Sequence, residues 1–148
     1  MIKVLFVCSH NSARSQMAEA FLNKLGEGCF EAESAGLEIA QLNPLVIKVM
    51  EEIGYDLSRN SIDSVFDFYK AGKTYSVVVK VCDQANGQQC PVFPRTFKVL
   101  DWNFDDPTAF QGTDEKKLAK TRKVRDEIKA KVEEFITENK EYALNRMR

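Results

Sequence analysis

The most constraining feature of the chain is a cysteine that ends an apolar run and is followed by an arginine-serine pair. Residues 2–7 are almost entirely apolar, Cys8 comes next, and Arg14 and Ser15 precede a helical pattern that starts at Gln16. Such a run is typical of a parallel strand buried on both faces, and the helix that follows points free N–H groups into the loop. The C-x5-R-S spacing therefore predicts an oxyanion-binding loop with a thiol at its base, formed by Ser9, His10, Asn11, Ser12, Ala13, Arg14 and Ser15.

The residue types in this loop suit nucleophilic attack on a tetrahedral anion. The thiolate is the reactive form of cysteine, and a helix N-terminus together with a guanidinium favours that form. Arg14 offers a planar fork that matches two oxygens of the anion, and the Ser15 hydroxyl is placed to donate to the Cys8 sulfur. We give His10 no catalytic role, because beside Cys8 in a tight loop its side chain is expected to point to solvent. The alternative is a buried structural cysteine with a surface arginine nearby.

Beyond the loop, apolar strands alternate with amphipathic helices. This alternation predicts a single α/β domain over residues 1–148, a three-layer doubly wound sheet of four parallel strands flanked by helices. Ligands of such sheets bind outside the carboxyl ends of the strands, where Cys8 and Cys82 would both lie. The patterns place strands over residues 2–7, 30–35, 75–81 and 99–102, helices over 16–25, 44–53 and 114–139, and a short helical turn within 61–69.

Charge and cysteine usage narrow the setting. The net charge of −1 gives no global field that would favour nucleic acid or an anionic membrane, so neither is an expected partner. The chain shows no signal-peptide pattern and no apolar stretch long enough to span a bilayer, which predicts a protein of the reducing cytoplasm. There, free or redox-active cysteines are expected rather than structural disulfides. Zinc is disfavoured because the cysteines form no C-x2-C pair and His10 is the one histidine; Cys29 is expected to be structural.

The loop and several further motifs resemble the low-molecular-weight tyrosine phosphatase superfamily and, more narrowly, its thioredoxin-coupled arsenate reductases. The resemblance implies the phosphatase-like version of the predicted fold, arsenate as substrate, phosphate and sulfate as analogues, thioredoxin as reductant, and no tightly bound cofactor. The motifs that carry it, besides Cys8–Ser15, are Gln16–Glu19, Ser34–Gly36, Leu42–Pro44, Cys82, Cys90-Pro91 and Trp102–Pro107.

The resemblance also implies a relay of three thiols. Cys8 would attack arsenic, Cys82 would attack Cys8 and expel arsenite, and Cys90 would attack Cys82, leaving a disulfide for thioredoxin to reduce. Asp106, which precedes Pro107, matches the family's general acid. Asp105 is its competitor, and the alternative for both aspartates is a role in the loop alone.

Other hypotheses remain open on the sequence. A phosphatase would use Cys8, Arg14 and Asp106 without further thiols, although Thr108 stands where that branch usually has a tyrosine. A third class is a non-enzymatic oxyanion-binding or redox-sensing module. Seven residues separate Cys82 from Cys90, one more than in the best-known reductases, and Ala13 replaces a cysteine found in some members. Some reductases bind a potassium ion, for which the matching oxygen donors are Asn11, Glu19, Ser34 and Asp63; a solvated polar cluster is the alternative.

Overall fold

The computed structural model describes residues 1–8, 13–38, 41–81 and 91–146, and in that part of the chain four parallel strands form one sheet. The strands lie in the order β2-β1-β3-β4 and are parallel in every pairing. This arrangement confirms the predicted fold class. The strand bounds are β1 Ile2–Cys8, β2 Phe30–Gly36, β3 Val77–Lys80 and β4 Lys98–Asp101.

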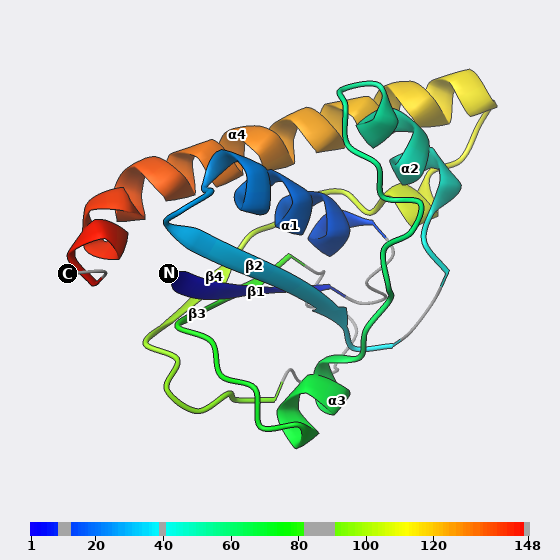
Figure 1. Ribbon diagram of the computed structural model, residues 1–148. Helices are drawn as coiled ribbons and strands as arrows, with labels where there is room; N and C mark the ends of the chain where they lie inside the picture. Colours follow the sequence, from blue (N-terminus) through cyan, green and yellow to red (C-terminus); the bar gives the residue numbers. More distant parts are fainter. Residues whose placement is uncertain (9–12, 39–40, 82–90, 147–148) are drawn as a thin grey trace.

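Helices cover the two faces of the sheet unequally (Figure 1). The face that carries α1 (Arg14–Leu25) and α2 (Pro44–Glu51) is also covered by the long α4 (Asp114–Arg146). The opposite face carries the short α3 (Val65–Lys70). A further short helical segment, η2, spans Pro107–Ala109. Among the described residues, no helix combines the length and apolar composition that crossing a membrane requires.

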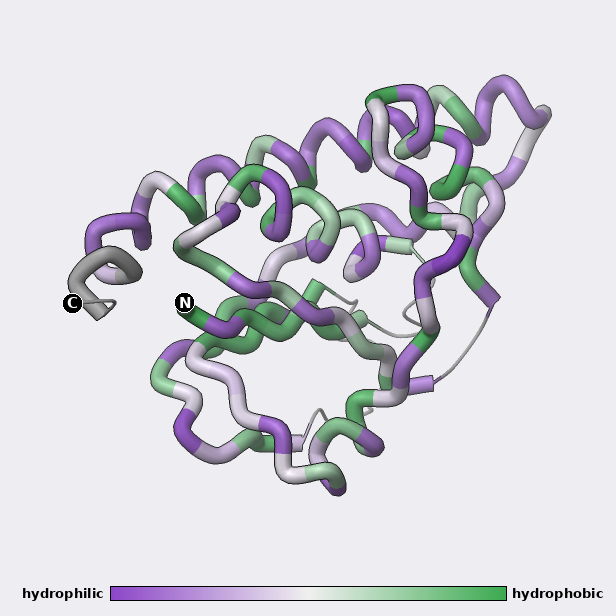
Figure 2. Tube along the Cα trace, in the orientation of Figure 1, coloured by the Kyte–Doolittle hydropathy of each residue, from purple (hydrophilic) through white to green (hydrophobic). Residues whose placement is uncertain are grey.

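The β1 strand supplies side chains to both cores. Val4 and Phe6 belong to the core under α1 and α4, whereas Leu5 and Val7 belong to the smaller core on the α3 side, and all four are fully buried. Strands β1 and β3 are accordingly mostly apolar in the middle of the molecule, while α4 is mostly hydrophilic (Figure 2). Burial on both faces explains why β1 lacks the alternation of a half-exposed strand.

Two helix ends differ from the sequence-based prediction. Helix α1 begins at Arg14, two residues before the expected Gln16, because its first turn is built from the site residues rather than from the apolar stripe that periodicity detects. Helix α4 continues to Arg146 instead of ending near Asn139. The ring of Tyr142 packs against the ring of Phe97, with 5.1 Å between their centroids. This tertiary contact stabilises the last turns of α4.

Other boundaries agree more closely. The predicted cap of α2 is present, since the Asn43 side chain accepts a hydrogen bond from Leu45 N at 2.9 Å. The helical turn expected within residues 61–69 is α3. Strand β3 is shorter than the expected 75–81, and Trp102, expected within the fourth strand, is buried directly after it.

Candidate active site

The end of β1 is where the chain changes direction across the sheet. Strand β1 lies between β2 and β3, so one connection leaves it toward one edge and the next returns toward the other. Cys8 is the last residue of β1, and its carbonyl oxygen accepts a hydrogen bond from Leu37 N at 3.1 Å. On the other side, Val81 N donates to Val7 O at 2.8 Å. Crevices at such switch points are the usual ligand sites of open α/β sheets.

Cys8 is buried and touches the first turn of α1. Its relative exposure is 3%, and its Sγ lies 2.8 Å from the Oγ of Ser15, which is fully buried. The contact between these two side chains expected from the sequence is therefore present. A hydroxyl that donates to sulfur stabilises the thiolate over the thiol, which is the form a nucleophile needs.

Arg14 is also buried, and two groups from the segment after β4 hold it. Its Nη1 donates to the carbonyl oxygen of Phe104 at 3.1 Å, and its Nη2 lies 3.4 Å from Oδ2 of Asp106. The ring of Phe104 packs edge-on against Trp102, which fixes the path of this segment. The structure thus brings together Arg14 and Asp106 from distant parts of the chain. The sequence had singled out both residues but not the Phe104 carbonyl that orients the guanidinium.

The two candidate acids differ in their surroundings. Asp106 is partly buried and pairs with Arg14, whereas Asp105 is exposed. Asp106 also has a backbone role, since its carbonyl oxygen accepts from Ala109 N at 3.0 Å at the start of η2. A carboxyl beside the guanidinium that would hold the anion is placed to exchange a proton with that anion. The position favours Asp106 over Asp105 as the acid.

Several predicted site residues lie outside the described part of the chain. These are Ser9, His10, Asn11 and Ser12 of the loop, together with Cys82 and Cys90. Ala13 is described and is the N-cap residue of α1, with no side-chain cap. The site that can be built from contacts therefore consists of Cys8, Ala13, Arg14, Ser15 and Asp106.

Three of the four predicted potassium donors are described, and Glu19 is the most perturbed of them. Desolvation by burial raises the pKa of Glu19 to about 7, hydrogen bonds from Ser34 oppose the rise, and the charges of Glu33 and Asp63 add to it. Glu19, Ser34 and Asp63 are thus close enough to interact, which spacing alone could not show. No cluster of three or more His, Cys, Asp or Glu side chains arranged to hold a metal occurs in the described ranges.

The neighbouring Glu33 behaves differently. Burial acts to raise its pKa, but hydrogen bonds from Tyr75 and Lys73 outweigh that effect and lower it. The Tyr75 hydroxyl donates to Glu33 at 2.7 Å and Lys73 Nζ donates to it at 2.9 Å. Glu33 is therefore a compensated anion, whereas Glu19 has no nearby cation among the causes that shift its pKa.

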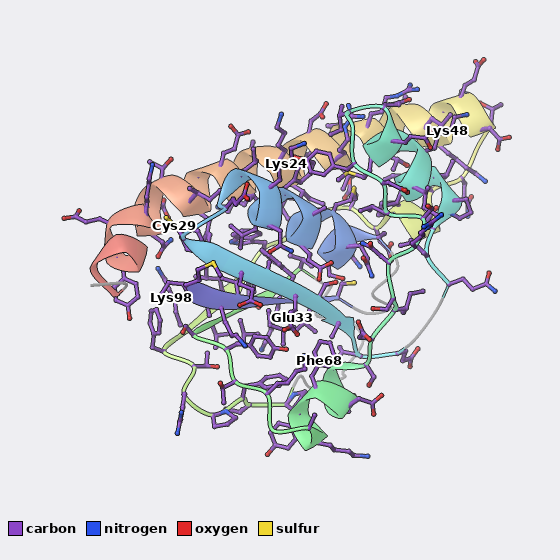
Figure 3. The ribbon with its side chains drawn as sticks, in the orientation of Figure 1. Lys24, Cys29, Glu33, Lys48, Phe68 and Lys98 are labelled. Carbon is purple, nitrogen blue, oxygen red and sulfur yellow. The ribbon has the colours of Figure 1, made fainter. Side chains whose placement is uncertain are left out.

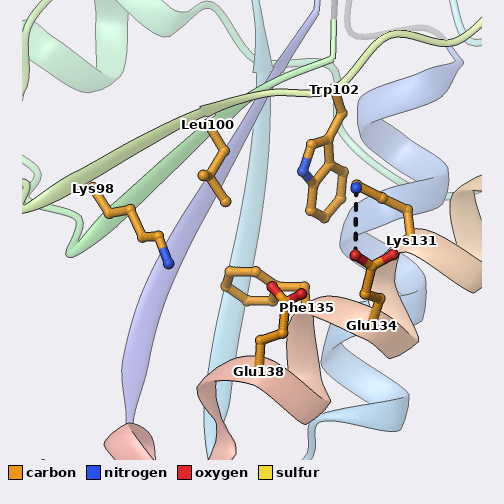
Figure 4. A pocket seen from close by; sticks show the side chains of 7 residues that line it. All are labelled: Lys98, Leu100, Trp102, Lys131, Glu134, Phe135 and Glu138. Atoms are coloured by element: carbon orange, nitrogen blue, oxygen red, sulfur yellow. Dashed lines mark ion pairs between the residues drawn. The ribbon is translucent and has the colours of Figure 1, made fainter.

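Two other features lie away from this site. Cys29 precedes β2 at the amino-terminal edge of the sheet, where its carbonyl oxygen accepts from Ile2 N at 2.9 Å (Figure 3). A strand of seven residues, roughly 20 Å at ~3.3 Å per residue, separates that edge from Cys8, so Cys29 is far from the Cys8 thiol. A hollow between β4 and α4 contains the Lys131–Glu134 ion pair and no thiol (Figure 4). Its lining residues are Lys98, Leu100, Trp102, Lys131, Glu134, Phe135 and Glu138.

Comparison with known sequences agrees with this geometry. The family described as low molecular weight phosphotyrosine protein phosphatase matches residues 3–145. An arsenate reductase of Halalkalibacterium halodurans is 38% identical over 132 residues, which cover 89% of this chain and 93% of that protein. A glutaredoxin arsenate reductase of Synechocystis is 38% identical over 137 residues, covering 92% of this chain and 97% of that one.

Solved structures of arsenate reductases are also similar to this chain. A structure described as an arsenate reductase in the phosphate binding state superposes with a TM-score of 0.77 at 36% identity, covering 93% of this chain and 98% of the other. A thioredoxin-dependent arsenate reductase of Corynebacterium glutamicum superposes with a TM-score of 0.69 at 28% identity, covering 93% of this chain and 61% of the other.

Proposed function

The chain belongs to the low molecular weight phosphotyrosine protein phosphatase family, and within this family we propose that it is an arsenate reductase, which converts arsenate to arsenite. The observation that carries the proposal is the arrangement at the end of β1. A buried thiol lies there, 2.8 Å from the Ser15 hydroxyl, and strand β3, which Cys82 follows in the sequence, ends beside it. Relatives named arsenate reductase match nearly the whole chain, which supports this function over the phosphatase alternative.

In the first step, the Cys8 thiolate attacks the arsenic atom of bound arsenate. A sulfur–arsenic bond forms and one arsenic–oxygen bond breaks, with Asp106 giving a proton to the oxygen that leaves as water. Arg14 and the backbone N–H groups of the loop stabilise the negative charge on the remaining oxygens. The contact of Asp106 Oδ2 with Arg14 Nη2 supports these assignments, because it places the acid beside the anion-binding group.

The second step supplies two electrons. The Cys82 thiolate attacks the Cys8 sulfur, a Cys8–Cys82 disulfide forms, and the electron pair of the sulfur–arsenic bond passes to arsenic, which leaves as arsenite. Arsenic is reduced from the +5 to the +3 state while two thiols become one disulfide. The Cys90 thiolate then attacks Cys82, which frees Cys8 and leaves a Cys82–Cys90 disulfide.

The backbone around Cys82 supports this exchange, although Cys82 itself lies outside the described residues. Val81, to which Cys82 is bonded, donates its N–H to Val7, the residue before Cys8. In the register of β1 and β3, Val7 lies opposite Lys80, so Val81 follows opposite Cys8 and Cys82 is the residue bonded to Val81. A disulfide requires Cα atoms about 5.5–6 Å apart, and adjacent strands about 4.7–4.9 Å apart bring the two segments into that range. The second thiol is thus tethered to the strand next to the first.

A protein dithiol is the proposed reductant, and thioredoxin is the first candidate. Val92, two residues after Cys90, is 87% exposed, and Val99 on the edge strand β4 is 55% exposed. Both border an apolar hollow on the α3 side of the sheet, together with Val78 and Lys80. An exposed apolar surface next to a redox-active cysteine suits the docking of a partner protein. Because the relay needs reduced thiols, we place the reaction in the cytoplasm.

We also propose a potassium ion beside the loop, held by Glu19, Ser34 and Asp63, with Asn11 as the fourth residue. Carboxylate and hydroxyl oxygens are ligands of hard cations. The rise in the pKa of Glu19 supports the fit, because a bound cation would offset both its desolvation and the repulsion from Asp63. The ion would supply positive charge beneath the anion loop.

The decisive experiment follows arsenate-dependent NADPH oxidation by the purified protein with thioredoxin and thioredoxin reductase. Wild type is expected to turn over many times. The Cys90→Ser variant is expected to release a single equivalent of arsenite and then stop, because its Cys8–Cys82 disulfide is not resolved. Cys29→Ser is the matched control and keeps full turnover.

Two outcomes would contradict the proposal. Hydrolysis of para-nitrophenyl phosphate with no arsenite, unaffected by Cys90→Ser, would identify a phosphatase. Arsenate binding without turnover under any reductant would identify a binding module. Activity with glutaredoxin in place of thioredoxin would keep the reductase function and correct only the partner.

A further inference from the structure

Gln16 is a buried polar residue to which the proposed reaction gives no role. It follows Ser15 in the first turn of α1, and its relative exposure is 1%. Its side-chain amide forms hydrogen bonds with the segment that connects α2 to α3. This segment passes the start of α1 (Figure 1). Nε2 donates to the carbonyl oxygen of Ser61 at 2.9 Å, and Oε1 accepts from Nδ2 of Asn60 at 3.0 Å. We call these three residues the amide clamp.

The same segment also holds the end of the strand that carries the thiol. The Ser61 hydroxyl donates to Oδ2 of Asp63 at 2.8 Å, and Asp63 O accepts from Gly36 N at 2.8 Å. The next residue, Leu37, donates its N–H to Cys8 O. One short segment is therefore bonded to the start of α1 on one side and, through β2, to Cys8 on the other.

These hydrogen bonds form a closed circuit of contacts, which the contact between Cys8 Sγ and Ser15 Oγ completes. The Sγ–Oγ separation of 2.8 Å depends on where the first turn of α1 stands relative to the end of β1. The amide clamp fixes the first turn, and the Leu37–Cys8 bond fixes the strand end.

We propose that Gln16 is a positioning residue for Cys8, which acts by holding the Ser15 hydroxyl against the sulfur. The inference rests on the proposed role of Cys8 as the nucleophile. It predicts that loss of the clamp weakens thiolate stabilisation even when the protein remains folded, because hydrogen bonds to charged groups depend on geometry.

The structure offers a matched control at the other end of α1. Asn23 ties the helix to β2 in the same manner, with Nδ2 donating to Ala32 O at 3.0 Å and Oδ1 accepting from Ala32 N at 2.8 Å. Replacing either amide by an apolar side chain of similar size removes two hydrogen bonds from the same helix. Only the Gln16 clamp lies next to Ser15.

The test measures the rate of Cys8 alkylation by iodoacetamide against pH, resolved by mass spectrometry of the Cys8 peptide. In Gln16→Met we expect alkylation at neutral pH to slow about tenfold and the profile to move to higher pH, the size expected for a lost hydrogen bond to a charged group. Asn23→Leu should lower Tm, by less than Gln16→Met because Asn23 is exposed, and should leave the profile in place. In Ser15→Ala, adding Gln16→Met should produce little further change, because both act through one contact.

A Gln16→Met profile equal to wild type, with only a lower Tm, would show that the clamp is merely structural and would overturn the proposal. If Gln16→Met does not fold, Asn60→Ala removes one of the two bonds from an exposed position, and a smaller shift in the same direction is expected. No shift in Asn60→Ala would then overturn it. Alkylation needs no arsenate, so the result stands apart from the outcome of the reductase assay.

Discussion

The pKa of Glu19 makes a quantitative prediction about stability and pH. Burial raises it from 4.5 to about 7 in the folded protein. Below about pH 4.5 the carboxyl is protonated in both the folded and the unfolded protein, so it does not lower the free energy of unfolding. Between these values the unfolded chain loses the proton that the folded protein keeps, so the free energy of unfolding falls as pH rises. At 1.36 kcal/mol per pKa unit, the full loss above about pH 8 is about 3 kcal/mol.

The assay is urea unfolding of wild type and Glu19→Gln at about pH 4.5 and about pH 8.5 in a potassium-free buffer. Glutamine has nearly the same shape but does not ionise, so the difference between the two proteins isolates this carboxyl from all other titrating groups. Wild type should lose about 3 kcal/mol relative to Glu19→Gln across this range. Adding potassium chloride in place of tetramethylammonium chloride should restore most of the loss in wild type and none in the variant.

Parallel pH dependence of the two proteins would refute the argument that Glu19 is desolvated and uncompensated. A loss of the expected size that potassium does not restore would keep that argument and refute the ion site. Glu19→Asp provides a further control, since a shorter carboxylate keeps the charge but changes its distance from Ser34 and Asp63.

The remaining predictions concern turnover. Asp106→Asn should lower the rate of the first arsenite-forming step by about 10²–10⁴-fold, the usual contribution of a general acid, whereas Asp105→Asn should lie within about twofold of wild type. Rapid-quench measurement of arsenite distinguishes them, and equal effects would reject Asp106 as the acid. Val92→Glu should raise the KM for thioredoxin about tenfold, with single-turnover arsenite release unchanged, because it charges the proposed docking surface. Leu25→Glu, at another exposed apolar position, is its control, and an unchanged KM in Val92→Glu would place the reductant elsewhere.

Much of the fold could be predicted because local sequence patterns determine it. The continuous apolar run of β1 indicates burial on both faces, and Val4 and Leu5 indeed belong to different cores. Asn43 followed by Pro44 predicts a helix start that the structure confirms. Prediction was weaker where a boundary depends on a distant partner, as at the end of α4, where Tyr142 packs on Phe97.

The candidate active site also has some features that the sequence determines and others that depend on distant contacts. The sequence by itself determined that a thiol ends a buried strand six residues before an arginine, because both facts are covalent or periodic. Only the tertiary structure decided that Asp106 lies beside Arg14, since the segment that brings it there is positioned by Trp102 and Phe104 packing 90 residues along the chain from the loop.

The structure likewise decided the surroundings of two polar residues, Gln16 and Glu19, that the sequence motifs include. The sequence motif includes Gln16 without indicating its contacts, and the hydrogen bond from Gln16 to Ser61 spans 45 residues. The pKa of Glu19 depends on burial and on the charges of Glu33 and Asp63, which come together only when α1 packs against β2 and the segment before α3 bonds the end of β2. Local chemistry selects the nucleophile, but desolvation and long-range hydrogen bonds exist only in the folded protein, and those set how the nucleophile is held.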